Sequence, residues 1–231
     1  MSVRPESAST DGWIRRFAAS AAATEAELTA LDQQVGDGDF GTNLLAGLDA
    51  TLRRLDQGTA PGAAGPLEAA AAAFLDEVGG TSGPLFGLLF QEMAVAVAAA
   101  GDALDIAALA SGAGNGLAAI QRVGEASVGD KTLVDALAPA VMALGSFPPA
   151  ADPAGALARA ADAAWEGVGS TTRLTARRGR ASYVGDRAAG VPDPGAVGIG
   201  LLFSAAAGTV SSLEPLLRGP VPDDVPVERS A

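Results

Sequence analysis

The sequence predicts an all-α protein in which eight helices form a single domain. Hydrophobic residues make up 48% of the chain, many of them alanine, and only 18% of the residues are charged, which is typical of tightly packed helices. Aromatic residues make up 4%, and runs of β-branched residues are few, which argues against an all-β fold. Apolar residues recur at helical spacing in eight segments, and no break between them is long enough to separate two domains.

The first two predicted helices flank a stretch rich in glycine and aspartate. Apolar positions follow helical spacing from about Asp11 to Gln34, and again from Thr42 to about Leu55. The sequence GDGDFGTN, residues 36–43, joins these helices. Residues 1–9 show no such pattern, so we expect a flexible N-terminal tail before the first helix.

Three helices follow in the middle of the chain. The third begins after the loop 57–66 and stops at Gly79-Gly80, because paired glycines terminate helices. The fourth follows the sequence GGTSGP and ends at Gly101, and the fifth spans roughly Asp105 to Val123.

The last three helices are separated by proline-rich and irregular segments. The sixth is predicted from about Lys131 to Leu144, and the seventh from about Pro153 to Leu174. The eighth opens with Asp193-Pro194, an acidic N-cap followed by proline at the first helical position, and extends to about Leu213. The folded domain therefore covers residues 10–214, with a flexible C-terminal tail at 215–231.

Composition and charge exclude several classes of function. The formal charge of −12 argues against a nucleic acid or an anionic membrane as partner. The chain has no cysteine and no histidine, which excludes disulfides, thiolate sites, imidazole ligands and Ser-His-Asp catalysis within it. A metal ion must therefore bind to oxygen atoms, which favours Mg²⁺, Ca²⁺ or Mn²⁺.

Two features of the sequence predict a cytoplasmic protein without a membrane span. The N-terminal sequence lacks the apolar region of a secretory signal. The longest apolar run, residues 196–210, is short and rich in small residues, so a buried helix is the better interpretation.

Three aspartates near the first glycine-rich stretch form a candidate metal site. Asp32 lies at the end of the first predicted helix, and Asp37 and Asp39 follow among glycines that let the backbone fold tightly. Three converging carboxylates repel one another unless a cation neutralises them. The alternative is an acidic helix terminus with aspartate caps, which is common and binds nothing.

Two familiar motifs are excluded at this stretch. An EF-hand loop needs a glutamate at its twelfth position, but Leu48 or Asn43 stands there when the loop starts at Asp37 or Asp32. The sequence Asp39-Phe40-Gly41 spells the DFG of protein kinases, but their catalytic loop needs a histidine that this chain lacks.

Three further segments carry polar residues at helix ends. GGTSGPL, from Gly79, could expose backbone N–H groups and hydroxyls to a phosphate. The same sequence is equally typical of a capped helix start that binds no ligand. GDKTLVDAL, from Gly129, holds the only lysine, Lys131, which could equally pair with a neighbouring aspartate. The segment 177–196 contains four arginines, which indicate a solvated surface or a phosphate-binding loop. Together with the aspartates, these segments describe a nucleotide site unlike a P-loop.

Four segments resemble the nucleotide-binding L subunit of dihydroxyacetone kinase, which also occurs as the C-terminal domain of single-chain ATP-dependent dihydroxyacetone kinases. The segments are LDQQVGDGDFGTN, GGTSGPLFGLLF, GDKTLVDALAPA and GRASYVGDRAAGVPDPGA, spread from about Leu31 to Ala196. Four motifs in order make the resemblance specific, and it covers nearly the whole folded chain. It implies a barrel of eight antiparallel helices, in agreement with the helix count above.

The resemblance also implies the ligands and their residues. In the family, the aspartates that match Asp32, Asp37 and Asp39 bind two Mg²⁺ ions that bridge the phosphates of ADP or ATP. No catalytic residue is expected beyond these ligands, and no contact is assigned to Lys131 or Thr132. The implied nucleotide contacts are Phe40, Gly41, Thr42, Asn43, Thr81, Ser82, Gly124, Leu133, Arg180, Asp193, Pro194 and Gly195.

The same resemblance implies a partner protein. The family's K subunit holds the hydroxyketone covalently through a histidine, which this chain does not contain. We therefore expect a Mg²⁺–nucleotide-binding kinase subunit that transfers a phosphoryl group from ATP to dihydroxyacetone or a related short ketose on a K subunit. In one version of the family a phosphohistidine-carrying phosphotransferase protein rephosphorylates the bound nucleotide, and in the other ATP exchanges. The sequence is compatible with both, and with a homodimer.

One residue departs from the family pattern. Family members usually carry histidine where this chain has Phe40, which removes a polar group beside the phosphates but leaves the metal ligands intact. An alternative hypothesis is therefore a non-catalytic nucleotide-binding sensor that reports phosphorylation state to a regulator. A helical scaffold without a ligand would leave the four polar motifs without a role.

Overall fold

The structure is a computed structural model that describes residues 9–148, 152–179, 181–184 and 188–218. This described part is all-α and contains no strand, as predicted. Most of the two predicted tails, residues 1–8 and 219–231, lies outside it. The helices are α1 (Thr10–Val35), α2 (Phe40–Gln57), α3 (Ala64–Glu77), α4 (Ser82–Ala100), α5 (Ile106–Gly124), α6 (Val134–Gly145), α7 (Pro153–Thr171), α8 (Ala181–Val184), α9 (Pro194–Ser204) and α10 (Glu214–Leu217).

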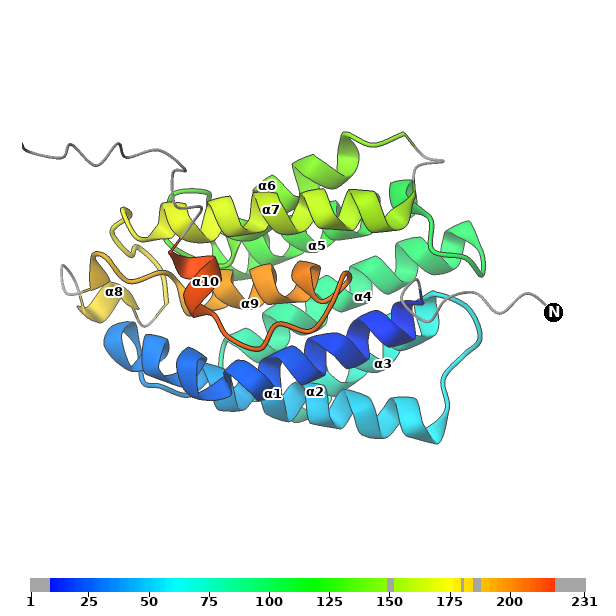
Figure 1. Ribbon diagram of the computed structural model, residues 1–231, viewed down its shortest axis with the longest axis horizontal. Coiled ribbons are helices and arrows are strands. Elements are labelled where there is room, and N and C mark those ends of the chain that lie inside the picture. The colour runs from blue at the N-terminus through cyan, green and yellow to red at the C-terminus, as the bar shows by residue number, and fades with distance from the viewer. Residues whose placement is uncertain (1–8, 149–151, 180, 185–187, 219–231) are drawn as a thin grey trace, which may run out of the picture.

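In the part of the chain that the structure describes, eight long helices, α1 to α7 and α9, form a closed, antiparallel ring (Figure 1). Each helix from α1 to α7 contacts the next, and α9 then contacts both α7 and α1, which closes the ring. Short connections reverse the chain between neighbours, as in other antiparallel helical bundles. The predicted barrel is confirmed, and the predicted count of eight holds for the long helices. The four-residue helices α8 and α10 were not predicted.

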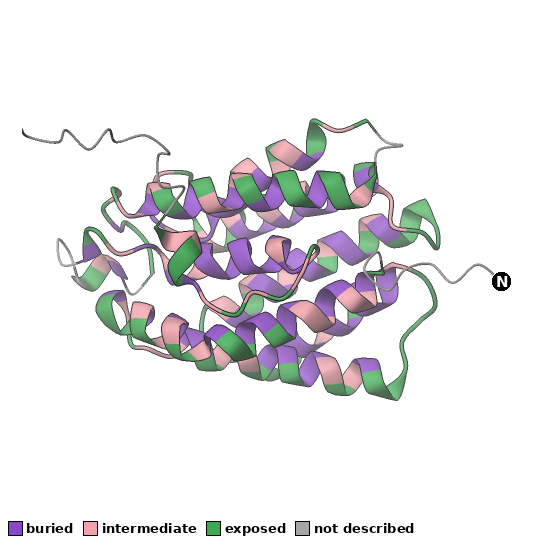
Figure 2. Ribbon diagram, viewed as in Figure 1, coloured by how far each residue is buried: buried purple, intermediate pink, exposed green. Residues whose placement is uncertain are grey.

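The core lies inside this ring, and α9 is its most deeply buried element. All residues from 196 to 203 are buried, as expected for a helix that is apolar on every side. Besides α7 and α1, α9 contacts α6 and α2. Its glycines leave room for large rings, because a Cβ at Gly198 would lie 2.8 Å from Cζ of Phe40, and one at Gly200 would lie 2.8 Å from Cε2 of Trp165. In Figure 2 the buried surfaces of the helices face inward and the exposed ones outward.

Helix α4 is long and apolar enough to cross a membrane by length and composition alone. It packs between α3 and α5, and its side chains Phe86, Leu89, Phe90 and Met93 are buried in the core. A core helix of a folded domain passes the same test, so α4 is described here as part of the barrel.

The predicted end of the last long helix near Leu213 is wrong, because α9 ends at Ser204. The guanidinium group of Arg16 donates to the carbonyl oxygens of Ala205 and Ala206 at 2.7 and 2.8 Å. The chain then runs along α1, where the N–H of Val210 donates to the Ser20 hydroxyl at 2.9 Å. Side chains of α1 thus satisfy backbone groups that a longer helix would have paired internally.

The sixth long helix, α6, begins at Val134, three residues after the predicted start at about Lys131. Lys131 has a φ of 62°, which is the left-handed region and incompatible with an α-helix. The Asp135 carboxylate accepts hydrogen bonds from the N–H groups of Gly129 and Thr132 at 2.5 and 2.8 Å. It therefore holds the preceding residues in a compact loop. The other predicted boundaries of the long helices differ from the observed ones by no more than three residues.

Close packing of α5 against α4 generates a stability prediction. A Cβ at Gly112 would lie 2.6 Å from Cα of Met93 and 2.7 Å from the carbonyl oxygen of Glu92, which are both backbone atoms. Gly112→Ala should therefore lower the free energy of unfolding by roughly 1–3 kcal/mol. Chemical denaturation followed by circular dichroism measures this change.

The matched control is Gly114→Ala, two residues along the same helix. A Cβ there would meet only Cγ1 of Val141, at 3.7 Å. The higher helix propensity of alanine should make this variant neutral or more stable by up to about 1 kcal/mol. Equal destabilisation of both variants would contradict the close α4–α5 contact.

Candidate functional site

The antiparallel ring brings four connections to one end of the molecule. Neighbouring helices alternate in direction, so the α1–α2, α3–α4, α5–α6 and α7–α9 connections share an end. The last of them contains α8, at the left of Figure 1. These connections and the adjoining helix ends surround an open pocket with about 930 Å³ of empty space, its mouth included.

Most of the residues predicted to bind metal or nucleotide line this one pocket. Gly41, Thr42 and Asn43 lie in the first turn of α2 and are not part of the lining, and Arg180 lies outside the described residues. The structure brings together Asp32, Asp37, Asp39, Phe40, Thr81, Ser82, Gly124, Leu133, Asp193, Pro194 and Gly195.

The predicted contacts outside the lining join α2 to α1. The hydroxyl of Thr42 donates to Oε1 of Glu25 at 3.0 Å. A Cβ at Gly41 would lie 2.6 Å from the carbonyl oxygen of Glu25, so only glycine allows the helices to approach so closely. In this structure Gly41 and Thr42 position the start of α2 beside the pocket.

The three predicted metal ligands converge. Asp32 lies in the last turn of α1, Asp37 lies in the connection, and Asp39 is the N-cap residue of α2. One carboxylate oxygen from each of them lies within 4.8 Å of the other two. Asp32 is buried, and its Oδ2 accepts the N–H of Phe40 at 3.0 Å, which fixes the carboxylate against the start of α2.

A glycine makes room for the innermost carboxylate. A Cβ at Gly36 would lie 2.3 Å from Oδ1 of Asp32, so any other residue would displace that oxygen. The φ of Gly36 is −149°, which every residue can adopt, so the requirement is one of space. Two residues later, Gly38 has a φ of 80°, where glycine is favoured for its backbone freedom.

This donor set fits a hard divalent cation. All three side chains offer oxygen, and three carboxylates so close together are stabilised by a positive ion among them. Mg²⁺ takes a few carboxylate ligands and fills its remaining positions with water or phosphate oxygens. The open side of the pocket leaves space for such additional ligands.

The α3–α4 connection supplies a second, polar wall. Thr81 is the N-cap residue of α4, and its side chain does not cap the helix. Gly80 before it has a φ of 74°, which turns the chain into the helix. The N–H groups of the first turn of α4 and the hydroxyls of Thr81 and Ser82 are therefore placed where an anion could bind.

An apolar wall completes the pocket. It is formed by Leu85 of α4, Ile120 of α5, Leu133 before α6 and Pro194 of α9. The turn at Gly195 lies close to this wall, since a Cβ there would lie 3.3 Å from Cβ of Leu133. The pocket thus has a charged end and an apolar end, an arrangement suited to a ligand with phosphate groups and a flat base.

A buried lysine, Lys131, and a partly buried aspartate, Asp193, also line the pocket, and both contact the end of α7. The ammonium group of Lys131 donates to the carbonyl oxygens of Thr171 and Val191 at 2.5 and 2.7 Å. Asp193 is the N-cap residue of α9, and its Oδ1 accepts the N–H of Ala196 at 2.7 Å. Its own N–H donates to the Thr171 hydroxyl at 2.9 Å.

Burial changes the acidity of both side chains. Desolvation raises the pKa of Asp193 from 3.8 to about 7, although the Ala196 N–H and the Lys131 charge act in the opposite direction. The charges of Asp135 and Asp32 add to the increase. Burial lowers the pKa of Lys131, and the neighbouring carboxyls of Asp193 and Asp135 oppose this effect.

Phe40 contacts the aspartate triad through its backbone, and its side chain belongs to the core. Its N–H binds Asp32, as described above, while its ring is buried and packs against Phe86 with ring centroids 6.4 Å apart. Gly198 of α9 provides the space for both rings. The structure therefore places an apolar side chain where the resemblance implies a polar one.

Some residues in the pocket were not predicted to bind a ligand. The sequence could have indicated two of them: Lys131 is the only lysine of the chain, and Arg178 lies in the arginine-rich segment. Arg178 forms two long ion pairs, at 3.6 Å with Glu125 and 3.9 Å with Asp130. The apolar lining residues had no sequence signal, because they follow the same helical spacing as core residues. These are Val35, Leu85, Ile120, Ala126 and Val134.

The chain matches a known protein-family model. The DAK2 domain matches residues 34–208, which is most of the described chain. The matched range includes the α1–α2 connection and every other connection around the pocket.

Curated proteins and solved structures agree with this match. The chain is 38% identical to the ADP-binding subunit DhaL of PEP-dependent dihydroxyacetone kinase 2 from Listeria innocua, over 73% of this chain and 78% of the relative. It is 38% identical to L-erythrulose 1-kinase from Mycolicibacterium smegmatis, over 83% of this chain and 34% of the relative. The crystal structure of the dihydroxyacetone kinase from C. freundii with AMP-PNP and Mg²⁺ superimposes with a TM-score of 0.66 and 27% identity, over 86% of this chain and 33% of that chain.

The space at Gly36 generates a prediction for metal binding. Gly36→Ala should push the Asp32 carboxylate away from its two partners and weaken Mg²⁺ or Mn²⁺ affinity about tenfold, with little change in melting temperature. Isothermal titration calorimetry with Mn²⁺ measures the affinity. The control is Gly155→Ala in α7, where a Cβ would meet nothing within 4 Å. Unchanged affinity in Gly36→Ala would contradict the placement of Asp32 in the site.

The raised pKa of Asp193 predicts how its contribution to stability depends on pH. Folded protein keeps this proton up to about pH 7, whereas unfolded protein releases it near pH 4, so the wild type loses stability as pH rises between these values. Asp193→Asn keeps an oxygen for the Ala196 N–H but cannot ionise. The melting temperature of the variant, relative to wild type, should therefore increase from pH 5 to pH 8. Parallel melting profiles, recorded with a chelator and without nucleotide, would show that burial does not raise this pKa.

Proposed function

Because the chain belongs to the DAK2 domain family, we propose that it is the nucleotide-binding L-type subunit of a dihydroxyacetone kinase. The observation that carries the proposal is the convergence of the aspartate triad, Thr81-Ser82 and the Asp193–Gly195 turn on one pocket with a charged and an apolar end. These residues come from three different connections and the helix ends beside them, between 32 and 195 in the sequence. The names of its relatives, an ADP-binding DhaL subunit and a kinase with AMP-PNP and Mg²⁺, support the same ligand class.

The charged end would hold the phosphates of ATP or ADP through Mg²⁺. Asp32, Asp37 and Asp39 are the proposed ligands, for two ions as the family resemblance implies. When bound, Mg²⁺ neutralises the charge of the transferring phosphoryl group, which is a main requirement of this reaction. Thr81, Ser82 and the first N–H groups of α4 would orient phosphate oxygens from the opposite wall.

The apolar end would hold the adenine ring. Leu85, Ile120 and Leu133 offer aliphatic surface on one side, and the Pro194-Gly195 turn offers it on another. The absence of a side chain at Gly195 lets the backbone approach the ligand closely. This arrangement would hold the nucleotide at both ends.

The acceptor of the phosphoryl group would be bound by a partner. The chain has no histidine with which to hold a hydroxyketone covalently, so we propose a K subunit for this task. Dihydroxyacetone or a related short ketose is the proposed substrate, and the L-erythrulose 1-kinase among the relatives supports this class. The open mouth of the pocket is where such a partner would present its substrate.

A second function is favoured by Phe40. Its ring lies in the core and offers no hydrogen bond to a phosphate, so a nucleotide-binding sensor without transfer activity would share the pocket described here. The two functions differ in one measurement, namely the phosphorylation of dihydroxyacetone when the purified protein is mixed with a K subunit and ATP. Product formation at turnover would exclude the sensor as the main function.

The kinase function predicts the effect of Asp37→Asn. Loss of one proposed metal ligand should reduce turnover in the reconstituted assay about a hundredfold and abolish the Mg²⁺ dependence of nucleotide binding. Calorimetry with ADP, with and without Mg²⁺, measures the binding. Normal turnover together with unchanged Mg²⁺-dependent affinity would refute the proposed role of the triad.

The matched control carries the same chemical change elsewhere on α2. Asp49 is exposed, and it does not line the pocket. Asp49→Asn should leave turnover and nucleotide affinity at wild-type values. A loss in both variants would indicate that net charge, and not ligation, determines the affinity.

A further inference from the structure

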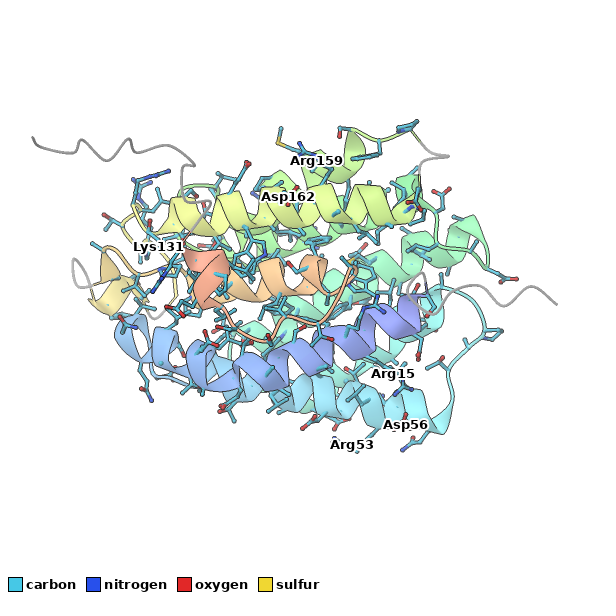
Figure 3. All side chains as sticks on the ribbon, viewed as in Figure 1. Arg15, Arg53, Asp56, Lys131, Arg159 and Asp162 are labelled. Atoms are coloured by element: carbon cyan, nitrogen blue, oxygen red, sulfur yellow. The ribbon has the colours of Figure 1, made fainter. Side chains whose placement is uncertain are left out.

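Lys131 is a buried cation to which no ligand contact was assigned. Only 1% of its surface is exposed, although charged side chains are almost never fully buried unless they are paired. It is the only lysine of the chain, and it lines the pocket near the proposed adenine end. Figure 3 shows it between α7 and the α8 region, at the pocket end of the barrel.

The contacts of Lys131 join three segments that are distant in sequence. Lys131 belongs to the α5–α6 connection, Thr171 is the last residue of α7, and Val191 precedes the turn into α9. The ammonium group donates to the carbonyl oxygens of Thr171 and Val191, at 2.5 and 2.7 Å. The Lys131 side chain therefore holds two carbonyl groups, 20 residues apart in the sequence, against the α5–α6 connection.

Backbone hydrogen bonds at the same junction extend this connection. The N–H of Gly190 donates to the carbonyl oxygen of Thr172 at 2.9 Å, and the N–H of Asp193 donates to the Thr171 hydroxyl at 2.9 Å. On the other side, the N–H of Arg177 donates to the carbonyl oxygen of Asp130 at 3.0 Å. The Asp193–Gly195 turn is thereby attached to the end of α7 and to the α5–α6 connection.

We propose that Lys131 is a positioning residue that holds the Asp193–Gly195 turn against the α5–α6 connection, so that the pocket wall is formed before the nucleotide binds. The inference rests on the proposed nucleotide-binding function. It adds a residue that does not contact the nucleotide itself but holds the residues that would. The left-handed backbone of Lys131 agrees with this role, because strain at a non-glycine residue persists only where the surrounding structure requires it.

The charge of Lys131 is essential to the proposed role. An apolar side chain of similar length would fill the space but would remove the ammonium donor from both carbonyl groups. The Thr171 carbonyl would keep the more distant N–H of Leu174, at 3.2 Å, and the contact that ties Val191 to Thr171 would be lost, which favours separation of the segments. Separation would allow the Asp193–Gly195 turn to move before binding, and the nucleotide would then have to order it. Ordering costs affinity, so a preformed wall binds more tightly than a mobile one.

The first experiment compares Lys131→Met with Arg16→Met. Arg16 is a matched control, since its cation also donates to two backbone carbonyls, those of Ala205 and Ala206. It lies 16 residues before Asp32 on α1, which is roughly 24 Å along the helix at 1.5 Å per residue. Both variants should lower the melting temperature, but only Lys131→Met should weaken ADP–Mg²⁺ binding, by about tenfold in calorimetry.

Hydrogen exchange tests the positioning without any nucleotide. In Lys131→Met, the amide protons of Gly190 and Asp193 should exchange about tenfold faster than in wild type, while amides in α4 should not change relative to Arg16→Met. Because this measurement needs no ligand, it separates the inference from the proposed function. Unchanged exchange at Gly190 and Asp193 in folded Lys131→Met would overturn the inference.

A second variant keeps the test decisive if Lys131→Met does not fold. The chain contains no cysteine, so Lys131→Cys introduces a single thiol that can be alkylated selectively in urea before refolding. Alkylation with 2-bromoethylamine restores a side chain of nearly the length and charge of lysine, whereas 1-bromopropane gives a neutral one. Recovery of ADP–Mg²⁺ affinity to within about threefold of wild type with the charged group only would support the inference.

The remaining outcomes are distinct. Equal affinity with the charged and the neutral group, or wild-type affinity in Lys131→Met, would overturn the inference and leave the proposed function intact. Failure of the wild-type protein to bind ADP–Mg²⁺ would overturn the proposed function and, with it, the inference. An equal loss of affinity in Arg16→Met would show that general stability, and not the position of the turn, controls binding.

Discussion

Closure of the ring by α9 is the constraint on which the rest of the structure depends. An apolar helix that is buried on all sides must be surrounded by other helices, and α9 meets this need between α7 and α1. Only in the closed ring does the Asp193–Gly195 turn lie in the same pocket as Asp32. The antiparallel order then places every second connection at the same end. The site therefore follows from the topology of the barrel as much as from its individual residues.

Much of this arrangement could be predicted from the sequence, because the informative residues are at helix ends. Glycine, aspartate and proline have specific roles where helices begin and stop, so Asp193-Pro194 and the 36–43 stretch were located correctly. The end of α9 could not be predicted, because Ala205 and Val210 suit a helix equally well. Its end depends on Arg16 and Ser20, which are about 190 residues earlier in the chain. Local patterns contain no information about such distant partners.

The same reasoning explains why the sequence singles out Lys131 but does not predict its contacts. Its helix-like surroundings predicted the first turn of α6, and the neighbouring aspartates left an ordinary ion pair as one explanation of the single lysine. In the structure its ammonium group binds two backbone carbonyls, and Asp135 binds two backbone N–H groups. Backbone partners leave no trace in side-chain composition. Phe40 is a comparable case, since the space for its ring comes from Gly198 on α9, and nothing near Phe40 in the sequence indicates this complement.

Closure by α9 also determines when the protein can become functional during its own synthesis. The aspartate triad is complete once α2 has emerged from the ribosome, but α9 and the chain along α1 are made after the other long helices. Helices α1 to α7 can pair with their neighbours as they appear, since those contacts are local. The contact between α1 and α9 joins the first and the last of the long helices, so it forms only after α9 has been synthesised. A nascent chain therefore carries its acidic cluster without the wall that faces it until α9 has been synthesised.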